Sequence, residues 1–186
     1  MDKELEEHLK LVKQDHAERT FFIEQRLGSE IHWFFTQGTQ ALKSELYLPA
    51  CSSFIIGIEA SLRMTLAALE NKSRVKELDS KKTLSNRLLL SAKEKGLPIE
   101  LLSFPGEGNF STNLSTKGKT LRNVEIVRVR HNLCHGNILE YVNTELGENN
   151  EFFTPECCRN LTKTIYEISR KWTQGLGEYQ NANFKA

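Results

Sequence analysis

Apolar residues along this chain recur at intervals of three and four, which is the spacing of one face of an α-helix. The pattern extends from Leu5 to Leu27 and again from Ile31 to Leu46, with Gly28 and Ser29 between the two runs. In the first run it is carried by Leu5, Leu9, Val12, His16, Phe22 and Ile23. The two runs predict an N-terminal helical extension over about residues 1–47, and Trp33–Phe35 is expected to belong to the core.

The most apolar segment runs from Pro49 to about Glu70 and predicts the central core helix. Its stripe advances from Ile55 in steps of three and four residues and consists of Phe54, Ile55, Ile58, Leu62, Leu66 and Leu69. Proline is favoured in the first turn of a helix, so Pro49 is expected to begin it. Glu59, Ser61 and Arg63 interrupt the segment, which is too short and too polar to be expected to span a membrane.

A further helix is predicted after a strongly charged connector at residues 72–82. Thr83 or Ser85 supplies the side-chain oxygen that caps it, and Gly96 ends it. Residues 103–119 are rich in Gly, Ser, Thr and Asn, a composition that predicts a long loop. This loop either forms part of a functional groove or merely connects two helices.

The C-terminal third contains two more predicted helices and a single segment with an extended pattern, Tyr141–Leu146. One helix runs from about Thr120 to His135 and stops at Gly136, which readily takes the left-handed conformation of a helix C-terminus. The last helix covers Thr154–Leu176 and leaves a polar tail over about residues 178–186. The pattern as a whole predicts one all-α domain of 186 residues, a bundle of about four to five main helices.

Composition narrows the class of protein without indicating its chemistry. The formal net charge is +1, so a nucleic-acid partner would need a local basic patch. The acidic N-terminus lacks the basic and apolar regions of a signal peptide, which predicts a cytoplasmic protein with no membrane partner. The four cysteines form no CxxC pair and are expected to act as small apolar side chains: Cys51, Cys134, Cys157 and Cys158.

The segment Arg130–Gly136 (RHNLCHG) carries the most specific chemical pattern. Arg130 offers a permanent cation whose fork of donors suits a phosphate, and His135 can exchange a proton near neutral pH. Five residues separate the two, so on an ideal helix their side chains diverge by about 140°. One helix would therefore form an incomplete site, whereas two copies across a two-fold axis could enclose one phosphate.

Other interpretations of the same helix stay open. His131 and His135 share a face and could bind zinc, but no third ligand is evident, and no metal is expected. Arg130 and His135 could instead form a helix cap, a dipole contact and an ion pair with a carboxylate. Arg128 and Asn132 share another face of the helix. Glu59 forms a buried ion pair with the Arg four residues later, or it supports the motif helix.

The segment Arg130–Gly136 resembles the motif of HEPN domains (higher eukaryotes and prokaryotes nucleotide-binding), in which an Arg precedes a His by a few residues. His131 matches the polar position that commonly follows the Arg, and Gly136 matches the glycine after the His. The resemblance implies an all-α bundle with the motif near the end of the penultimate long helix. The order of predicted helices from Pro49 to Leu176 agrees with that arrangement.

The resemblance also implies a function, namely a metal-independent endoribonuclease without a cofactor. It would act on RNA as a homodimer whose two motifs face each other. Arg130 would hold the scissile phosphate, and His135 would act as acid or base while the ribose 2′-hydroxyl attacks and leaves a cyclic phosphate. His131, Asn132 and Arg128 would be auxiliary residues, and Glu59 would support them.

HEPN nucleases often serve as toxins or as antiphage effectors, and such a protein has an antitoxin or another regulatory protein as a partner. Two alternatives remain from the sequence. One is a non-catalytic module of the same fold that binds nucleotide, RNA or protein beside the motif helix. The other is a structural helical dimer in which the motif forms an ion-pair network at the interface.

Overall fold

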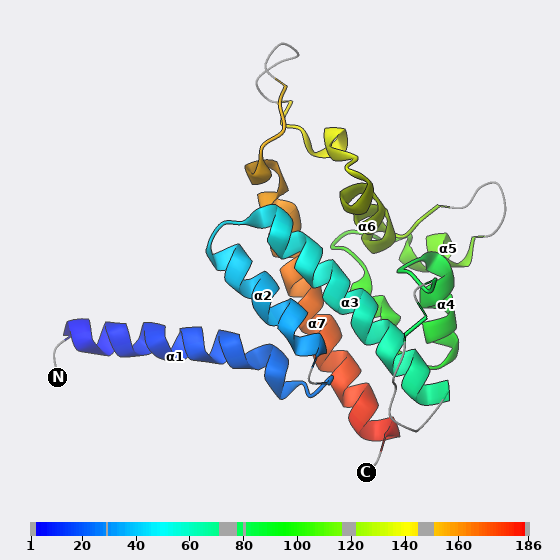
Figure 1. Cartoon of the computed structure of the whole chain (residues 1–186), viewed down its shortest axis with the longest axis horizontal. Coiled ribbons are helices and arrows are strands. Elements are labelled where there is room, and N and C mark those ends of the chain that lie inside the picture. The colour runs from blue at the N-terminus through cyan, green and yellow to red at the C-terminus, as the bar shows by residue number, and fades with distance from the viewer. Residues whose placement is uncertain are drawn as a thin grey trace.

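The computed structural model describes residues 3–28, 30–70, 78–79, 81–116, 122–144 and 151–184, and within these ranges it is helical, without a β-strand (Figure 1). The α-helices are α1 (Lys3–Glu24), α2 (Ile31–Lys43), α3 (Tyr47–Glu70), α4 (Asn86–Glu94), α5 (Phe110–Ser115), α6 (Glu125–His135) and α7 (Arg159–Asn183). Short 3-10 helices lie at Ile99–Leu102, Ile138–Tyr141 and Pro155–Cys158. The all-α prediction is thereby confirmed for the described residues.

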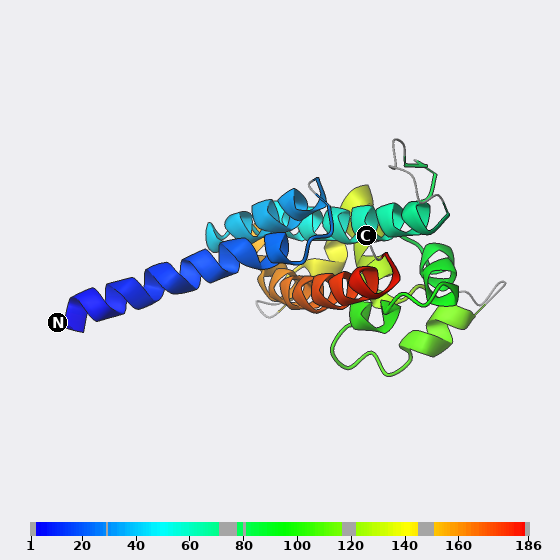
Figure 2. The same ribbon diagram turned by 90° about the horizontal axis from the view of Figure 1, so that it is seen from below.

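Helix α3 occupies the centre of the bundle and packs against both α2 and α7 (Figures 1 and 2). Two glycines allow α2 and α3 to approach closely. A Cβ at Gly38 would lie 2.8 Å from the ring of Phe54, and one at Gly57 would lie 2.8 Å from the ring of Phe35. The two helices therefore interlock by ring against backbone, and alanine at either position would force these rings to shift.

The expectation that this segment is too short and too polar to span a membrane is wrong, because α3 has 24 residues and is apolar enough to do so by length and composition. Its packing against α2 and α7 is that of the core helix of a bundle. Its inward positions include Phe54, Ile58 and Leu62, all fully buried. On the inner face Ser61 Oγ also accepts a hydrogen bond of 2.8 Å from the indole Nε1 of Trp172 in α7. This buried hydrogen bond ties the inner face of α3 to α7.

The N-terminal helices differ from the sequence pattern in detail. Helix α1 ends at Glu24, before Leu27, because Arg26 takes a positive φ of 56° and Gly28 one of 119°. Helix α3 begins at Tyr47, two residues ahead of Pro49. Of the predicted aromatic core residues at the start of α2, only Phe35 is buried, whereas the two before it are exposed. Ser29 lies outside the described residues.

The segment from residue 103 to 119 is not the continuous loop that its composition predicts. Helix α5 lies within it, and Phe110 and Leu114 of that helix are buried against the core. Only two apolar anchors in six residues give too short a pattern for recognition from sequence. Of the two predicted caps for α4, Ser85 is the cap, with Oγ accepting the Leu88 N–H at 3.3 Å. Residues 117–119, like most of the predicted connector at 72–82, lie outside the described part.

Both C-terminal helices have ends that differ from the prediction. Helix α6 begins at Glu125, with Val124 extended at φ −64° and ψ 154°. Thr120, where its start was predicted, lies outside the described residues. Helix α7 continues past Leu176 to Asn183, so much of the predicted polar tail is helical. Within the predicted extended segment, Tyr141 closes a 3-10 helix, and the following Asn143 forms only an isolated antiparallel bridge, with Phe152.

Tertiary hydrogen bonds account for the extra length of α7. The Tyr179 hydroxyl donates to the carbonyl oxygen of Lys95 at 2.7 Å, and Gln180 Nε2 donates to Thr65 Oγ1 at 2.8 Å. These residues attach the last turns of α7 to the end of α4 and to α3. Polar side chains of the predicted tail therefore hold this end of the helix against the bundle.

Candidate functional site

The first turn of α6 is capped by side chains that are remote in the sequence. The Val124 N–H donates to Asn86 Oδ1 at 3.2 Å, and the Glu125 N–H donates to Glu107 Oε1 at 2.8 Å. Asn86 Nδ2 in turn donates to the carbonyl oxygens of Arg122 and Asn113, at 2.9 and 3.2 Å. The N–H groups at a helix start lack intrahelical partners, so these contacts determine where α6 begins.

Arg130 points from α6 towards α3, where it pairs with Glu59. Its Nε lies 3.4 Å from Glu59 Oε2, and its side chain is 21% exposed. The same carboxylate accepts the Leu84 N–H at 2.8 Å and lies 3.8 Å from Arg63 NH1. One half-buried acid thus positions the motif arginine, the entry to α4 and a second arginine. The sequence left two roles open for Glu59, and the structure shows a contact for each. Glu59 pairs with Arg63 within α3, and it also pairs with Arg130 of α6.

His135 occupies the last turn of α6, and Gly136 ends the helix with φ 67° and ψ 25°. The Gly136 N–H bonds the carbonyl oxygen of Asn132, as expected for a left-handed C-cap. The His131 and His135 side chains are exposed, with ring centroids 4.4 Å apart. Both rings are therefore open to solvent, and His135 lies at the carbonyl end of α6.

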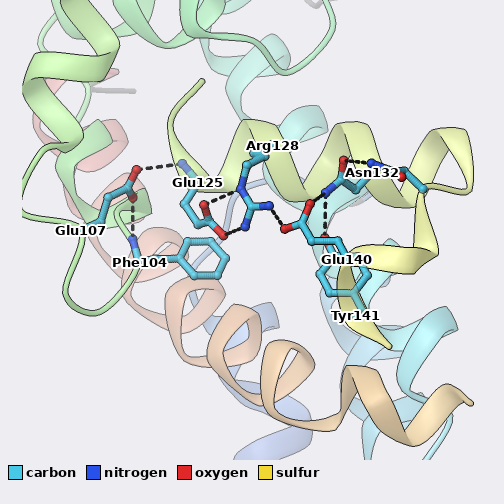
Figure 3. Close-up of polar contacts among 8 residues, drawn as sticks. Phe104, Glu107, Glu125, Arg128, Asn132, Glu140 and Tyr141 are labelled. Atoms are coloured by element: carbon cyan, nitrogen blue, oxygen red, sulfur yellow. Dashed lines mark hydrogen bonds and ion pairs between the residues drawn. The ribbon is translucent and has the colours of Figure 1, made fainter. Parts of the chain in front are cut away.

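Arg128 lies on another face of α6 and links the start of the helix to the segment that follows it (Figure 3). Its Nε donates to Glu125 Oε2 at 2.8 Å, and its terminal nitrogens reach Glu125 Oε1 and Glu140 Oε1. The hydrogen bond to Glu125 is the main cause that raises the pKa of Arg128 above its ordinary value. Two carboxylates therefore bind this guanidinium within its own subunit.

Asn132 is 4% exposed, and both ends of its amide are bonded. Its Nδ2 donates to Glu140 Oε2 and lies 3.4 Å from the Tyr141 hydroxyl, while its Oδ1 accepts from Asn137 Nδ2 at 3.1 Å. Burial is the main cause that raises the pKa of Tyr141, so the phenol stays a neutral partner. Asn132 acts as a positioning residue that folds the 3-10 helix Ile138–Tyr141 back against α6 (Figure 3).

The side chains of the motif residues thus point in three different directions around α6. Arg130 faces α3, Arg128 and Asn132 hold the chain after the helix, and the two histidines face solvent. Five residues separate Arg130 from His135, about 140° on an ideal helix, so one copy does not aim both side chains at a single point. Any reaction that needs both groups requires a second copy or a substrate that wraps the end of α6.

Sequence reasoning did not identify Asn86, Glu107 or Glu140 as part of this region. Asn86 and Glu107 act on backbone groups 38 and 18 residues away, and nothing in the local pattern around them indicates such a contact. Glu140 lies eight residues beyond Asn132, in the stretch after Gly136 for which the pattern predicted no helix. Their roles follow only from the way the elements pack.

The described residues include no group of three or more His, Cys, Asp or Glu side chains placed to hold a metal ion. His131 and His135 supply two such ligands at most. The chain was compared with models of protein families, with curated proteins and with solved structures, and none of them matches it.

Proposed function

We propose that this chain is a metal-independent endoribonuclease of the HEPN type, acting as a homodimer in which the α6 helices of two copies face each other. The observation that carries the proposal is the placement of the motif on α6. Arg130 is held at the surface by Glu59, and His135 is exposed in the last turn before Gly136. A fixed phosphate-binding cation and an exposed proton donor at one helix end suit phosphodiester cleavage.

In the proposed reaction the ribose 2′-oxygen attacks the neighbouring phosphorus and loses its proton to one His135. The bond from phosphorus to the 5′-oxygen breaks, and the leaving oxygen takes a proton from the His135 of the second copy. The products are a 2′,3′-cyclic phosphate and a free 5′-hydroxyl, with no water or metal consumed. Requirement for the 2′-hydroxyl would make the enzyme specific for RNA over DNA.

Arg130 would stabilise the charge on the phosphate through its terminal nitrogens, because the ion pair with Glu59 engages Nε. Glu59 would then be a positioning residue that sets the direction of the guanidinium. The His131 ring lies beside the His135 ring at an interplanar angle of 48° and would orient it. Arg128 and Asn132 would contribute indirectly, by holding the segment after α6 against the helix.

The test is RNA cleavage in EDTA by the full chain and by His135→Ala, with analysis of the product ends. His135 is the clean position because its side chain is exposed, whereas Arg130→Ala also removes an ion pair. Loss of the acid–base group is expected to lower the cleavage rate by at least about 100-fold. His8→Ala, an exposed histidine in α1, is the matched control and should cleave normally. Equal cleavage by wild type and His135→Ala would refute the proposed site.

The ion pair between Arg130 and Glu59 itself favours a second candidate, in which the motif has a purely structural role. Arg130→Lys separates the two, since lysine keeps the charge near Glu59 but loses the fork that grips a phosphate. A nuclease role predicts normal stability with strongly reduced cleavage. A structural role predicts that wild type does not cut RNA and that Arg130→Ala weakens dimerisation in sedimentation. RNA binding by wild type without cleavage would identify a non-catalytic module.

A further inference from the structure

Helix α1 runs out beyond the bundle, and its N-terminal half is exposed on all sides (Figures 1 and 2). Every residue from Lys3 to Gln14 is exposed. The middle of the helix is attached to α2 by Lys43, which pairs with Asp15 and with Glu18. Short helices without tertiary packing are marginally stable in water, so a projecting half-helix gains from a partner.

The exposed half carries a regular apolar stripe. Leu5, Leu9 and Val12 are 49%, 43% and 50% exposed, and His16 and Ile23 extend the same line towards the bundle. We call these five residues the α1 stripe. The steps from Leu5 to His16 are four, three and four residues, and Leu9, His16 and Ile23 are seven apart. This is the heptad spacing by which two helices pack side by side in a coiled coil.

We propose that α1 pairs with α1 of a second copy of this chain as a short antiparallel coiled coil. The pair is centred between Leu9 and Val12, so that Leu9 of each copy packs against Val12 of the other. Leu5 then lies opposite His16. Each contact occurs twice about a two-fold axis, which makes the α1 stripe complementary to itself.

Charges beside the α1 stripe favour a second copy of α1 as the partner and an antiparallel orientation of the two helices. In the antiparallel pair Glu6 of one copy lies opposite Lys13 of the other, and the attraction occurs twice. In a parallel pair Lys13 would face His8 of the second copy instead of an acid. Over its whole length α1 has six acidic and four basic residues, a balance that disfavours an anionic membrane surface as the occupant.

This contact is separate from the α6 contact of the proposed nuclease. Helices α1 and α6 lie at different ends of the molecule in Figure 1. The α1 pairing uses no residue of α6, and it neither requires nor excludes RNA cleavage. If the protein associates through both α1 and α6, disruption of the α1 stripe would abolish association through α1 and leave association through α6.

The test is sedimentation velocity of the full chain over a range of concentrations, comparing Leu9→Lys with Leu11→Lys. Leu11 is 61% exposed on the same helix but lies off the stripe, which makes it a matched control. A lysine at the centre of the pair occurs twice in each interface, so Leu9→Lys should raise the dissociation constant at least about tenfold. Leu11→Lys should leave it unchanged. Equal behaviour of the two variants, or a wild type without concentration-dependent association, would overturn the proposal.

Charge reversal tests the direction of the helices. Glu6→Lys and Lys13→Glu should each weaken association, because each places like charges together, and the double variant should restore it. Failure of the double variant to recover overturns the antiparallel arrangement. These sites are exposed, so circular dichroism should show unchanged helix content. His135→Ala should associate through α1 as wild type does, which keeps this outcome distinct from that of the nuclease test.

Discussion

Helices α6 and α1 contrast in how their positions are determined. Helix α6 has eleven residues, and side chains from α3, from α4 and from the segment before α5 bind its first turn and its flank. Helix α1 has twenty-two residues, and its N-terminal half is exposed throughout. The short helix is therefore held rigidly by distant contacts, while the long one depends on its own pattern and presents a surface to a partner.

The contrast separates two kinds of functional surface. A site that must place an arginine and a histidine accurately benefits from a helix whose ends and flanks are bonded to the rest of the fold. A surface for self-association needs only a regular apolar stripe with suitable charges beside it. The predictions below test how strongly each helix depends on the contacts that distinguish it.

The largest effect is expected from Asn86→Ala, which removes two hydrogen bonds to the chain entering α6 and a third to Asn113 in α5. Asn86 and Val124 are buried, so the Val124 N–H would be left without a partner inside the protein, and two part-buried carbonyl groups would also lose theirs. The free energy of unfolding should fall by about 3 kcal/mol. Urea denaturation followed by circular dichroism measures it. Asn123→Ala, at an exposed neighbour, should change stability by less than about 0.5 kcal/mol. A similar loss for both variants would contradict the capping role of Asn86.

A smaller effect is expected from Glu59→Gln, which keeps the shape of the side chain and an acceptor for the Leu84 N–H. It removes the negative charge that faces Arg130 and Arg63. The loss should be about 2 kcal/mol, between the values for exposed and buried ion pairs. Glu100→Gln is the control, because its pair with Lys93 is largely exposed and should contribute less than about 1 kcal/mol. If Glu59→Gln costs no more than this control, Glu59 does not hold α6.

The smallest effect is expected in α1, from Leu9→Ala measured at a protein concentration low enough to prevent self-association. The side chain is exposed, and alanine favours a helix, so stability should change by less than about 0.5 kcal/mol. Leu62→Ala in the fully buried part of α3 should cost roughly 2–5 kcal/mol in the same assay. A large loss of stability for Leu9→Ala would show that the N-terminal half of α1 packs on its own bundle. Helices α1 and α6 would then not differ in the way described above.

The local sequence pattern was sufficient to predict a structural feature wherever the contacts that determine it lie within a few residues. The apolar stripe of α3, the cap at Ser85 and the left-handed end of α6 at Gly136 were all predictable in this way. The motif was recognisable for the same reason, since Arg130 and His135 belong to one helix. Their use in RNA cleavage stays a prediction that the cleavage assay must decide.

The sequence by itself determined that the described chain is helical and where its most regular helices lie, because helix formation depends on contacts three and four residues apart. Only the tertiary structure decided where α6 begins and where α7 ends. It also decided that Asn132 is bonded internally and that Arg130 faces Glu59. Each of these depends on groups that lie many residues apart or whose direction is set by packing. Local hydrophobic and polar patterns do not encode such pairings, because they are selected by the fold as a whole.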